Sequence, residues 1–394
     1  MQKFGGTSVS TEERRKQLAS KVKTVIDKGM KPVVVVSAMG RIGDAYATDT
    51  LLSLVGNKFM RDNKNAQDLL MCCGEIISAV VVCNTLYNFG IKAIPLTGGQ
   101  AGIVTDDNFT NANYINTDPS NVLKVINDGM VPVITGFQGI TKDGFFTTLG
   151  RGGSDTSACI LGVALKAKEI EIYTDVDGIM TADPRLVEDV SLIDEVTYNE
   201  VYQLADQGAK VIHPKAVDLA KKANIPLLIK NTMSDSKGTL IIKEVSDENK
   251  RFITGITHLD NRIQVIVRLS ENPNHAAYRS LLDSIAKNNI SLDLINIFPA
   301  HQIFTINADE KEKLNQVLTK ANINFKTIDG CSTIAIVGSG MTGVPGVMAK
   351  IINTLTENNI EVLQTTDSNI TIWCLIYTSK LSQAVNLLHE KFGL

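Results

Sequence analysis

The sequence lacks the cysteine and histidine patterns of a zinc or disulfide protein. Its six cysteines form no CxxC pair, and its five histidines are scattered along 394 residues. This distribution gives little support for a protein-bound metal site. We therefore expect reduced thiols and no metal ligands.

Long apolar runs are also missing. The longest, such as residues 33–36 and 79–83, are much shorter than the roughly 20 residues that a membrane-spanning helix needs. The chain opens "MQKFGG", without a signal-like apolar stretch. The sequence therefore predicts a cytoplasmic protein that does not enter a membrane.

An excess of charge of one sign is absent as well. The net charge is −3 and no basic block stands out, which disfavours nucleic acid or a membrane surface as a partner. The composition is 44% hydrophobic, enough for a large core. A chain of 394 residues predicts two or three domains.

The chain does contain a regular alternation of strand-like and helix-like segments up to about residue 245. Buried strands such as 33–36 alternate with helices, of which 66–90 is the longest. This alternation predicts a mostly parallel sheet that is covered by helices on both faces. The polar stretch 243–251 predicts a linker at a domain boundary.

After this linker the sequence repeats itself with a shift of 70 residues. "AKNNISLDLI" at 286–295 matches "TENNIEVLQT" at 356–365. Each copy predicts strand, helix, strand, strand, helix, and two such small α+β modules can bury each other's faces as a pair. We expect a first domain over 1–245 and modules over 252–330 and 331–394.

A glycine run opens the second module. Gly338-x-Gly340-x-x-Gly343 follows an apolar strand and matches the dinucleotide fingerprint, although a lone match is weak. The module lacks the strand–helix–strand–helix series of a dinucleotide fold, and its first copy has no glycine at this place. We interpret the run as a strand-to-helix turn whose amides could hold a small carboxylate.

A second glycine cluster is "KFGGTS", residues 3–8; no Walker A loop, GxxxxGK[ST], occurs in the chain. Gly5 and Gly6 allow the backbone to approach a ligand, and Lys3 adds a positive point charge. Together they suit phosphate oxygens. Taken alone, the cluster is equally compatible with an ordinary glycine turn after an edge strand.

A third cluster is "TTLGRGGSDTSA", residues 147–158. We expect a strand to end here and a helix to begin, with Ser154 or Asp155 as its N-cap. The helix amides would favour an anion above 152–154, and Arg151 adds a planar fork matched to a carboxylate. The combination indicates an anion site rather than a helix cap alone.

The segment "YTDVDGIMTADPR", residues 173–185, has two interpretations. Its Asp, Gly and Pro residues are common in long surface turns. Alternatively it forms a nucleotide platform, with Asp175 near base and ribose and Arg185 near phosphates.

Two further places carry candidate residues. Glu75 lies in an otherwise apolar helix, where a buried carboxylate is costly unless it meets a cation. It is a candidate for a substrate ammonium or for a structural ion pair. In "GAKVIHP", Lys210 could reach a phosphate, whereas His213 is better explained by a structural role.

In combination, these motifs resemble the aspartate kinase family over essentially the whole chain. "KFGGTS", "VVVSAMG", "GRGGSDT", "YTDVDGIMTADPR" and "GAKVIHP" occur in this order before the tandem repeat. The resemblance implies a three-layer αβα sandwich of the amino acid kinase fold, followed by two ferredoxin-like ACT modules. "SAMGRIGDAYATDTLLSL" and the tail "DSNITIW" are most similar to Gram-positive members that diaminopimelate inhibits.

The resemblance also implies an activity and its partners. The reaction would be ATP-dependent phosphorylation of L-aspartate to 4-phospho-L-aspartate, with Mg²⁺ as cofactor. It is the first step towards lysine and diaminopimelate, threonine and methionine. The ACT modules would bind diaminopimelate, lysine or threonine as a feedback inhibitor. Exposed edges on the modules suggest a homodimer or larger homo-oligomer.

The family's functional residues can be placed on matching positions of this sequence. The resemblance assigns catalysis to Lys3, Asp155 and Lys210. It assigns ATP contacts to Lys3, Phe4, Gly5, Gly6, Thr174, Asp175, Met180, Arg185, Lys210 and Val211. It assigns aspartate contacts to Ser37, Thr48, Glu75, Arg151, Gly152, Gly153 and Ser154. It assigns effector contacts to Asn274, Ser291, Leu292 and Asp293.

These residue types suit the implied chemistry. The side-chain carboxylate of aspartate has a pKa of about 3.9, so this nucleophile is already ionised and needs no general base. The lack of an evident His–carboxylate pair fits that expectation. Mg²⁺, Lys3, Lys210 and glycine-loop amides would offset the negative charge, while Arg151 and Glu75 orient the substrate.

The sequence departs from the family in two places. The first strand is nearly absent before Lys3, where most members carry a few more apolar residues, so we expect that the natural chain could begin upstream of Met1. In the first module, "ENPNHAAY" replaces the usual Pro-Gly turn, although "SLD" at 291–293 still matches the effector stretch.

Three alternatives remain open on the sequence. Another amino acid kinase, such as a glutamate or acetylglutamate kinase, would not carry the paired ACT tail. A non-catalytic amino acid sensor would not need intact "KFGGTS" and "GRGGSDT" motifs. A dehydrogenase would rest on Gly338–Gly343 alone.

Overall fold

The computed structural model describes residues 1–40, 43–209, 211–268, 281–341 and 343–394. The chain divides into two compact units that interleave along the sequence. The N-terminal unit contains Met1–Ile179, Leu192–Asp206 and Lys210–Asn249. The C-terminal unit contains Met180–Ser191, Gln207–Ala209 and Lys250–Leu394.

The N-terminal unit is built on an eight-stranded sheet in the order β10-β12-β11-β9-β1-β2-β6-β3. Its strands are β1 (Gln2–Phe4), β2 (Val34–Val36), β3 (Ala93–Leu96), β6 (Val131–Thr135), β9 (Ile170–Thr174), β10 (Glu195–Thr197), β11 (Leu227–Asn231) and β12 (Thr239–Ile242). All neighbours pair in parallel except β11 and β12. The predicted mostly parallel sheet is confirmed.

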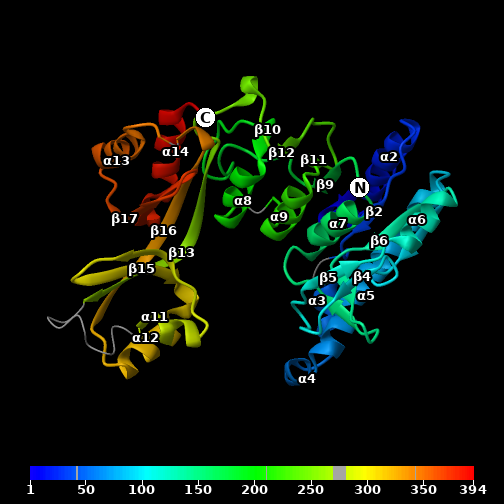
Figure 1. The fold of residues 1–394 in the computed structure, drawn as a ribbon, viewed down its shortest axis with the longest axis horizontal. Coiled ribbons are helices and arrows are strands. Elements are labelled where there is room, and N and C mark those ends of the chain that lie inside the picture. Colours follow the sequence, from blue (N-terminus) through cyan, green and yellow to red (C-terminus); the bar gives the residue numbers. More distant parts are fainter. Residues whose placement is uncertain (41–42, 210, 269–280, 342) are drawn as a thin grey trace. The chain divides into compact units, whose positions relative to one another are not determined.

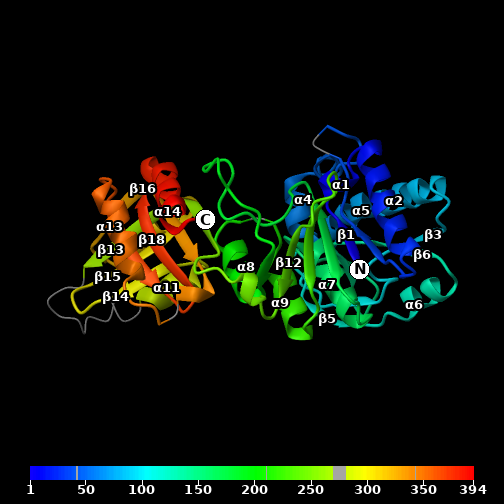
Figure 2. The same ribbon diagram turned by 90° about the horizontal axis from the view of Figure 1, so that it is seen from above.

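Helices cover both faces of this sheet (Figure 2). One layer contains α2 (Glu12–Asp27) and α5 (Lys64–Asn88). The other contains α6 (Ser120–Asn127), α7 (Gly153–Ala164), α8 (Tyr198–Asp206) and α9 (Pro214–Ala223). Short helices are α1 (Gly6–Val9), α3 (Thr48–Leu52) and α4 (Asn57–Asp62), and a 3₁₀ turn, η1 (Asp247–Asn249), ends the unit. This is the expected three-layer αβα sandwich.

A second, four-stranded sheet in the order β5-β4-β7-β8 adjoins α5. Its strands are β4 (Ile103–Thr105), β5 (Tyr114–Thr117), β7 (Gln138–Ile140) and β8 (Phe146–Thr148). Strand β8 ends at Thr148, shortly before α7 begins at Gly153, so the packing of this small sheet helps to set where that helix begins.

Helix α5 is the one helix among the described residues that is long and apolar enough to cross a bilayer. The core helix of a globular domain meets the same test. Here α5 packs on β2, β3, β6 and β8, and it buries Asp68 and Glu75.

The C-terminal unit contains one six-stranded antiparallel sheet in the order β14-β15-β13-β16-β18-β17 (Figure 1). Its strands are β13 (Gly255–Arg268), β14 (Asp293–Ile297), β15 (His301–Asn307), β16 (Phe325–Val337), β17 (Val362–Asp367) and β18 (Thr371–Tyr377). Its helices are α11 (Leu281–Lys287), α12 (Lys311–Lys320), α13 (Val347–Glu357) and α14 (Leu381–Phe392), with 3₁₀ turns η2 (Ala308–Glu310), η3 (Ser339–Met341) and η4 (Thr378–Lys380).

The predicted repeat is confirmed at the level of single residues. β15 begins at residue 301 and β18 at 371, while α12 begins at 311 and α14 at 381. Asn289 and Asn359 both adopt a left-handed backbone, with φ of 49° and 57°. Asparagine tolerates this conformation, which ends α11 and α13 in the same way.

The two modules have separate cores, but the chain does not pass through them one after the other. Ile263 and Val265 in the second half of β13 pack with the first module's helices. Ile253 and Ile256, which precede them, pack with α13 and α14 of the second module. The segment that opens the predicted first module, 252–330, therefore completes the core of the second.

The loop Met180–Ser191 also belongs to the core of the second module. Ala182 and Val187 are buried in it. Thr181 Oγ1 lies 2.8 Å from His389 Nε2 on α14, and Asn386 Nδ2 donates to Leu186 O at 2.6 Å.

The glycine run forms the expected strand-to-helix turn between β16 and α13, with Thr342 outside the described residues. A Cβ on Gly338 would lie 2.5 Å from the carbonyl oxygen of Phe252. A Cβ on Gly340 would lie 2.8 Å from Cα of the same residue. Both glycines therefore serve the close approach of the segment that completes this module.

Candidate active site

The site begins at the carboxyl ends of three parallel strands in the N-terminal unit. Phe4 of β1 is in register with Val36 of β2 and with Tyr173 of β9. The residues that follow these strands therefore emerge at one edge of the sheet. In open α/β sheets this edge is where ligands bind.

Strand alternation directs Lys3 to one face of the sheet and Phe4 to the other. The Phe4 ring stacks on Tyr173 with centroids 4.6 Å apart, within the core beneath α2 and α5. Lys3 faces α7, where its Nζ lies 2.8 Å from Asp155 Oδ1. The two side chains are only 11% and 13% exposed, so this ion pair is weakly screened.

The glycines after β1 lie as close to their neighbours as the motif predicts. A Cβ on Gly5 would lie 3.3 Å from Lys3 Nζ, and one on Gly6 would lie 2.9 Å from Ala38 O. The Gly5 amide already donates to Tyr173 O. Larger residues here would displace the lysine or the segment that follows β2.

Helix α7 begins differently from the prediction. The N-cap is Gly152, in a left-handed conformation with φ of 69°, and glycine has no side chain that could cap the helix. Ser154 and Asp155 lie inside the first turn, so the expectation that either caps the helix is wrong. The left-handed turn at Gly152 leads the chain into the helix without a side-chain cap. The acidic Asp155 in the first turn still complements the helix dipole.

Gly152 also packs against His213. A Cβ at residue 152 would lie 2.2 Å from the imidazole ring. His213 is itself the N-cap of α9, where its Nδ1 accepts from the Lys215 amide at 3.3 Å. Burial lowers the pKa of His213, which keeps Nδ1 available as an acceptor. The structural role predicted for this histidine is the one observed.

Glu75 enters the site from α5. The Ala38 amide donates to Glu75 Oε1 at 3.1 Å. Among the described residues, Oε2 has no hydrogen-bond partner although it is buried. Burial raises the pKa of Glu75 to about 8, against the lowering effect of the Ala38 bond. In the described part of the chain, no basic side chain forms an ion pair with Glu75, so the alternative of a structural ion pair is not supported.

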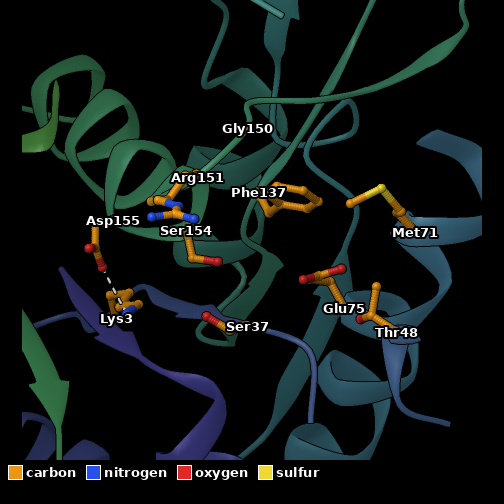
Figure 3. Close-up of a pocket in the computed structure, with 12 residues that line it drawn as sticks. Lys3, Ser37, Thr48, Met71, Glu75, Phe137, Gly150, Arg151, Ser154 and Asp155 are labelled. Atoms are coloured by element: carbon orange, nitrogen blue, oxygen red, sulfur yellow. Dashed lines mark ion pairs between the residues drawn. The ribbon is translucent and has the colours of Figure 1, made fainter. Parts of the chain in front are cut away.

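These side chains converge on one pocket of about 330 Å³ (Figure 3). It collects nine residues that the sequence proposed, namely Lys3, Ser37, Thr48, Glu75, Arg151, Gly152, Gly153, Ser154 and Asp155. In Figure 3 the Glu75 carboxylate points toward the side that carries Ser154 and Arg151. An acidic and a basic group therefore face the same space from different elements.

Three lining residues were not predicted: Met71, Phe137 and Gly150. Met71 lies one turn before Glu75 on α5, so helical spacing could have identified it. Phe137 follows the carboxyl end of β6, the same edge as the other residues. Its φ of 69° is unusual for a non-glycine residue, and only the structure reveals it.

Comparisons with known proteins agree with this architecture. The amino acid kinase family model matches residues 2–231, and an ACT domain model matches 326–390. Aspartokinase 1 of Bacillus subtilis (strain 168) is 43% identical over 399 residues, covering 100% of this chain and 98% of that protein. The chain belongs to the aspartokinase family. An aspartokinase from Geobacillus stearothermophilus is 37% identical, covering 100% of this chain and 97% of that protein.

The fold agrees with solved aspartokinase structures. E. coli aspartokinase III, crystallised in complex with aspartate and ADP, superposes with a TM-score of 0.80. The alignment covers 100% of this chain and 99% of that chain at 23% identity, which shows a common fold. The predicted amino acid kinase fold with C-terminal ACT modules is confirmed.

The nucleotide residues expected from the aspartokinase family are divided between the two units. Thr174 is the last residue of β9, which lies next to β1, and its Oγ1 donates to Oδ1 of the following Asp175 at 3.1 Å. Val211 lies in the same unit, while Lys210 lies outside the described residues. Met180 and Arg185 belong to the C-terminal unit. These assignments stay predictions.

Arg185 forms a local ion pair in that unit. Its Nη2 lies 2.6 Å from Asp183 Oδ2, and its side chain is 84% exposed. The hydrogen bonds from Arg185 lower the pKa of Asp183. This exposed pair leaves the guanidinium accessible to solvent.

Of the effector residues expected from the family, Ser291 and Leu292 lie between α11 and β14, and Asp293 is the first residue of β14. Arg262 Nη1 lies 3.0 Å from Asp293 Oδ2, Ser291 is exposed, and Leu292 packs against the first module's core. Asn274 lies outside the described residues. Their role in effector binding stays a prediction.

Proposed function

We propose that this pocket transfers the γ-phosphoryl group of ATP to the side-chain carboxylate of L-aspartate, forming 4-phospho-L-aspartate and ADP. The observation that carries the proposal is the opposition of Arg151 and Glu75 in one pocket beside the Lys3–Asp155 pair. A free amino acid presents a carboxylate and an ammonium group on the same carbon. The pocket offers a charge complement to both.

The two ends of the substrate would be held by different elements. The Arg151 guanidinium, before α7, matches the α-carboxylate with two parallel donors. The unpartnered Oε2 of Glu75 on α5 would receive the α-ammonium. Ser37, Thr48 and Ser154 supply hydroxyl groups around the remaining part of the substrate.

The attacking group requires no base. The side-chain carboxylate of aspartate is ionised at neutral pH, so the main task is to bring two anions together. Lys3 at the end of β1 and the first-turn amides of α7 would reduce the repulsion between this carboxylate and the phosphates. Lys210 would add a second positive charge.

The described residues also fit a nucleotide-bound Mg²⁺. They contain no group of three or more His, Cys, Asp or Glu side chains that could hold a metal on their own. Mg²⁺ in kinases is held mainly by the phosphates and one or two carboxylates, a role that Asp155 could fill. When bound, the ion neutralises charge on the β- and γ-phosphates.

Regulation would act through the C-terminal unit. We infer that diaminopimelate, lysine or threonine binds near 291–293 in the first ACT module and inhibits the enzyme. The edge strand β14 exposes Ile295 and Ile297, 45% and 62% exposed, which favours pairing with another copy of the chain. We further propose a cytoplasmic homo-oligomer with domains over 1–245, 252–330 and 331–394.

A hydroxylamine trap tests the activity directly. The enzyme is incubated with ATP, Mg²⁺ and a panel of amino acids, and the acyl phosphate is detected as its hydroxamate. Aspartate should give a hydroxamate, whereas glutamate and N-acetylglutamate should not. No product with aspartate would refute the proposal. Adding each of the three candidate effectors to the same assay identifies the inhibitor.

A further inference from the structure

A second acidic residue of α5, Asp68, is buried without lining the pocket. Its exposure is 0%, and it lies two helical turns before Glu75. A buried carboxylate is costly unless hydrogen bonds satisfy it. In the described part of the chain, no basic side chain forms an ion pair with Asp68.

Three donors from outside α5 satisfy this carboxylate. Thr148 donates twice, from its amide to Oδ2 at 2.9 Å and from its hydroxyl to Oδ1 at 2.8 Å. The Thr110 amide donates to Oδ2 at 2.9 Å. Burial raises the pKa of Asp68, and these bonds oppose the rise.

The residues that bond to Asp68 fix the position of the chain just before Arg151. Thr148 is the last residue of β8, three residues before Arg151. The Ala112 amide donates to Thr148 O at 2.8 Å, so both sides of this residue are held. The next residue, Leu149, donates its amide to Phe137 O at 2.9 Å.

The second donor segment supports the same loop. Thr110 has a φ of 75°, a strained value for a β-branched residue, which must be held by its surroundings. Its neighbour Asn111 lies against Gly150, where a Cβ would meet Asn111 Oδ1 at 2.5 Å. The Asp68 bond to Thr110 therefore fixes a surface on which Gly150 rests.

The two acidic residues of α5 thus reach opposite sides of the pocket. Glu75 enters the pocket itself, while Asp68 holds the strand end and the loop that precede Arg151. Because Asp68 and Glu75 lie on the same helix, one rigid element positions both the Glu75 side and the Arg151 side of the pocket.

We propose that Asp68 is a positioning residue that sets the separation between Arg151 and Glu75, and with it the recognition of the substrate amino acid. This inference rests on the proposed aspartate kinase activity. It places the determinant of amino acid size two turns away from the residue that touches the ammonium. ATP binding does not depend on it.

The test uses steady-state kinetics of the full chain with aspartate and ATP varied separately. Asp68→Ala should raise KM for aspartate at least tenfold, since a misplacement of about 1 Å can cost 100-fold, while KM for ATP changes less than twofold. Asp68→Asn should stay within about threefold of wild type. Its amide oxygen can keep both N–H donors, and its NH₂ can donate to Thr148 Oγ1.

Matched variants separate positioning from loss of structure. Thr148→Val removes only the hydroxyl donor and should raise KM for aspartate, whereas Thr148→Ser should restore it. Asp118→Asn is the control, because the Asp118 carboxylate accepts from the Ser120 amide at 3.1 Å, outside both β8 and the loop that carries Thr110. At a fixed concentration, aspartate should raise the melting temperature of wild type more than that of Asp68→Ala, while ADP should raise both equally.

The outcomes are distinct. If wild type forms no hydroxamate, the proposed function itself fails. If wild type is active but Asp68→Ala changes neither KM, or changes both equally, only the positioning role is overturned. Should Asp68→Ala not fold, an unchanged KM for aspartate in Thr148→Val overturns it instead.

Discussion

At the scale of single residues, Lys3 is the group whose position the structure defines most closely. It is held by β1 on one side and by the ion pair with Asp155 on the other. The low exposure of both side chains preserves the field of the ammonium in the pocket. We therefore propose that its main task is electrostatic rather than structural.

Lys3→Ala should lower kcat at least 100-fold, the usual cost of removing one such stabilising group. Folding should survive, because removing one partner of a buried ion pair costs about 3–5 kcal/mol, less than the stability of a typical large domain. Initial rates and urea unfolding check both expectations. The control is Lys16→Ala, whose exposed pair with Glu12 contributes little. Wild-type turnover in Lys3→Ala would contradict the assignment.

Glu75 should make aspartate binding depend on pH. Its pKa is about 8 in the folded chain without substrate, so the ionised form that attracts an ammonium is scarce near pH 6. KM for aspartate should therefore fall as pH rises from 6 to 8, by roughly tenfold per unit well below the pKa. Glu75→Gln should bind aspartate weakly with a flat profile. A flat wild-type profile would exclude this role.

The same group should affect stability with the opposite sign. Between about pH 4.5, the usual value for glutamate, and pH 8, the folded chain holds a proton that the unfolded chain releases. The free energy of unfolding contributed by Glu75 is therefore highest at low pH and declines as pH rises to 8. Urea unfolding of wild type and Glu75→Gln at several pH values measures the difference.

At the scale of elements, the start of α7 depends on close packing with α9. Gly152 needs a left-handed backbone and has no room for a side chain beside His213. The same contact places the first-turn amides of α7 over the pocket. A change here should disturb stability and catalysis together.

Gly152→Ala should therefore lose both stability and aspartate turnover. The matched control is Gly129→Ala, which also has a positive φ, 72°, but no atom within 4 Å of the new Cβ. The control should lose only about 1–2 kcal/mol of conformational free energy and keep its kcat. Denaturant unfolding with initial rates tests the pair. Equal losses in both variants would mean that the His213 contact is unimportant.

At the scale of the whole molecule, strand β13 serves two cores. Ile256 is buried in the core of the second module and Ile263 in that of the first. The loop Met180–Ser191 joins the second core as well, so segments far apart in sequence stabilise the C-terminal unit. Substitutions in the two halves of β13 should therefore destabilise different modules.

Ile256→Ala should increase amide hydrogen exchange in α13 and α14, whereas Ile263→Ala should increase it in α11 and α12. Each substitution removes a buried side chain and should cost about 2–5 kcal/mol. The two variants control for each other, because they change the same residue type in one strand. Identical exchange patterns would show that the modules unfold as a single core.

Much of the site was predictable because strand ends in a parallel sheet share an edge. Lys3, Ser37 and Thr174 follow from that rule, and "GRGGSDT" marks a helix start by its glycines. Phe137 and the role of Asp68 were not predictable, since they depend on a left-handed backbone and on contacts between residues 42 and 80 positions apart in the chain.

The sequence by itself determined the alternation of strands and helices, the 70-residue repeat and the family, because periodicity and motif order are properties of the chain. Only the tertiary structure decided that the segment opening the predicted first ACT module completes the core of the second, and that Gly338 and Gly340 allow this close contact. It also decided that Gly152, not Ser154 or Asp155, caps α7. These features depend on which backbones approach each other, and such contacts leave no periodic trace in the sequence.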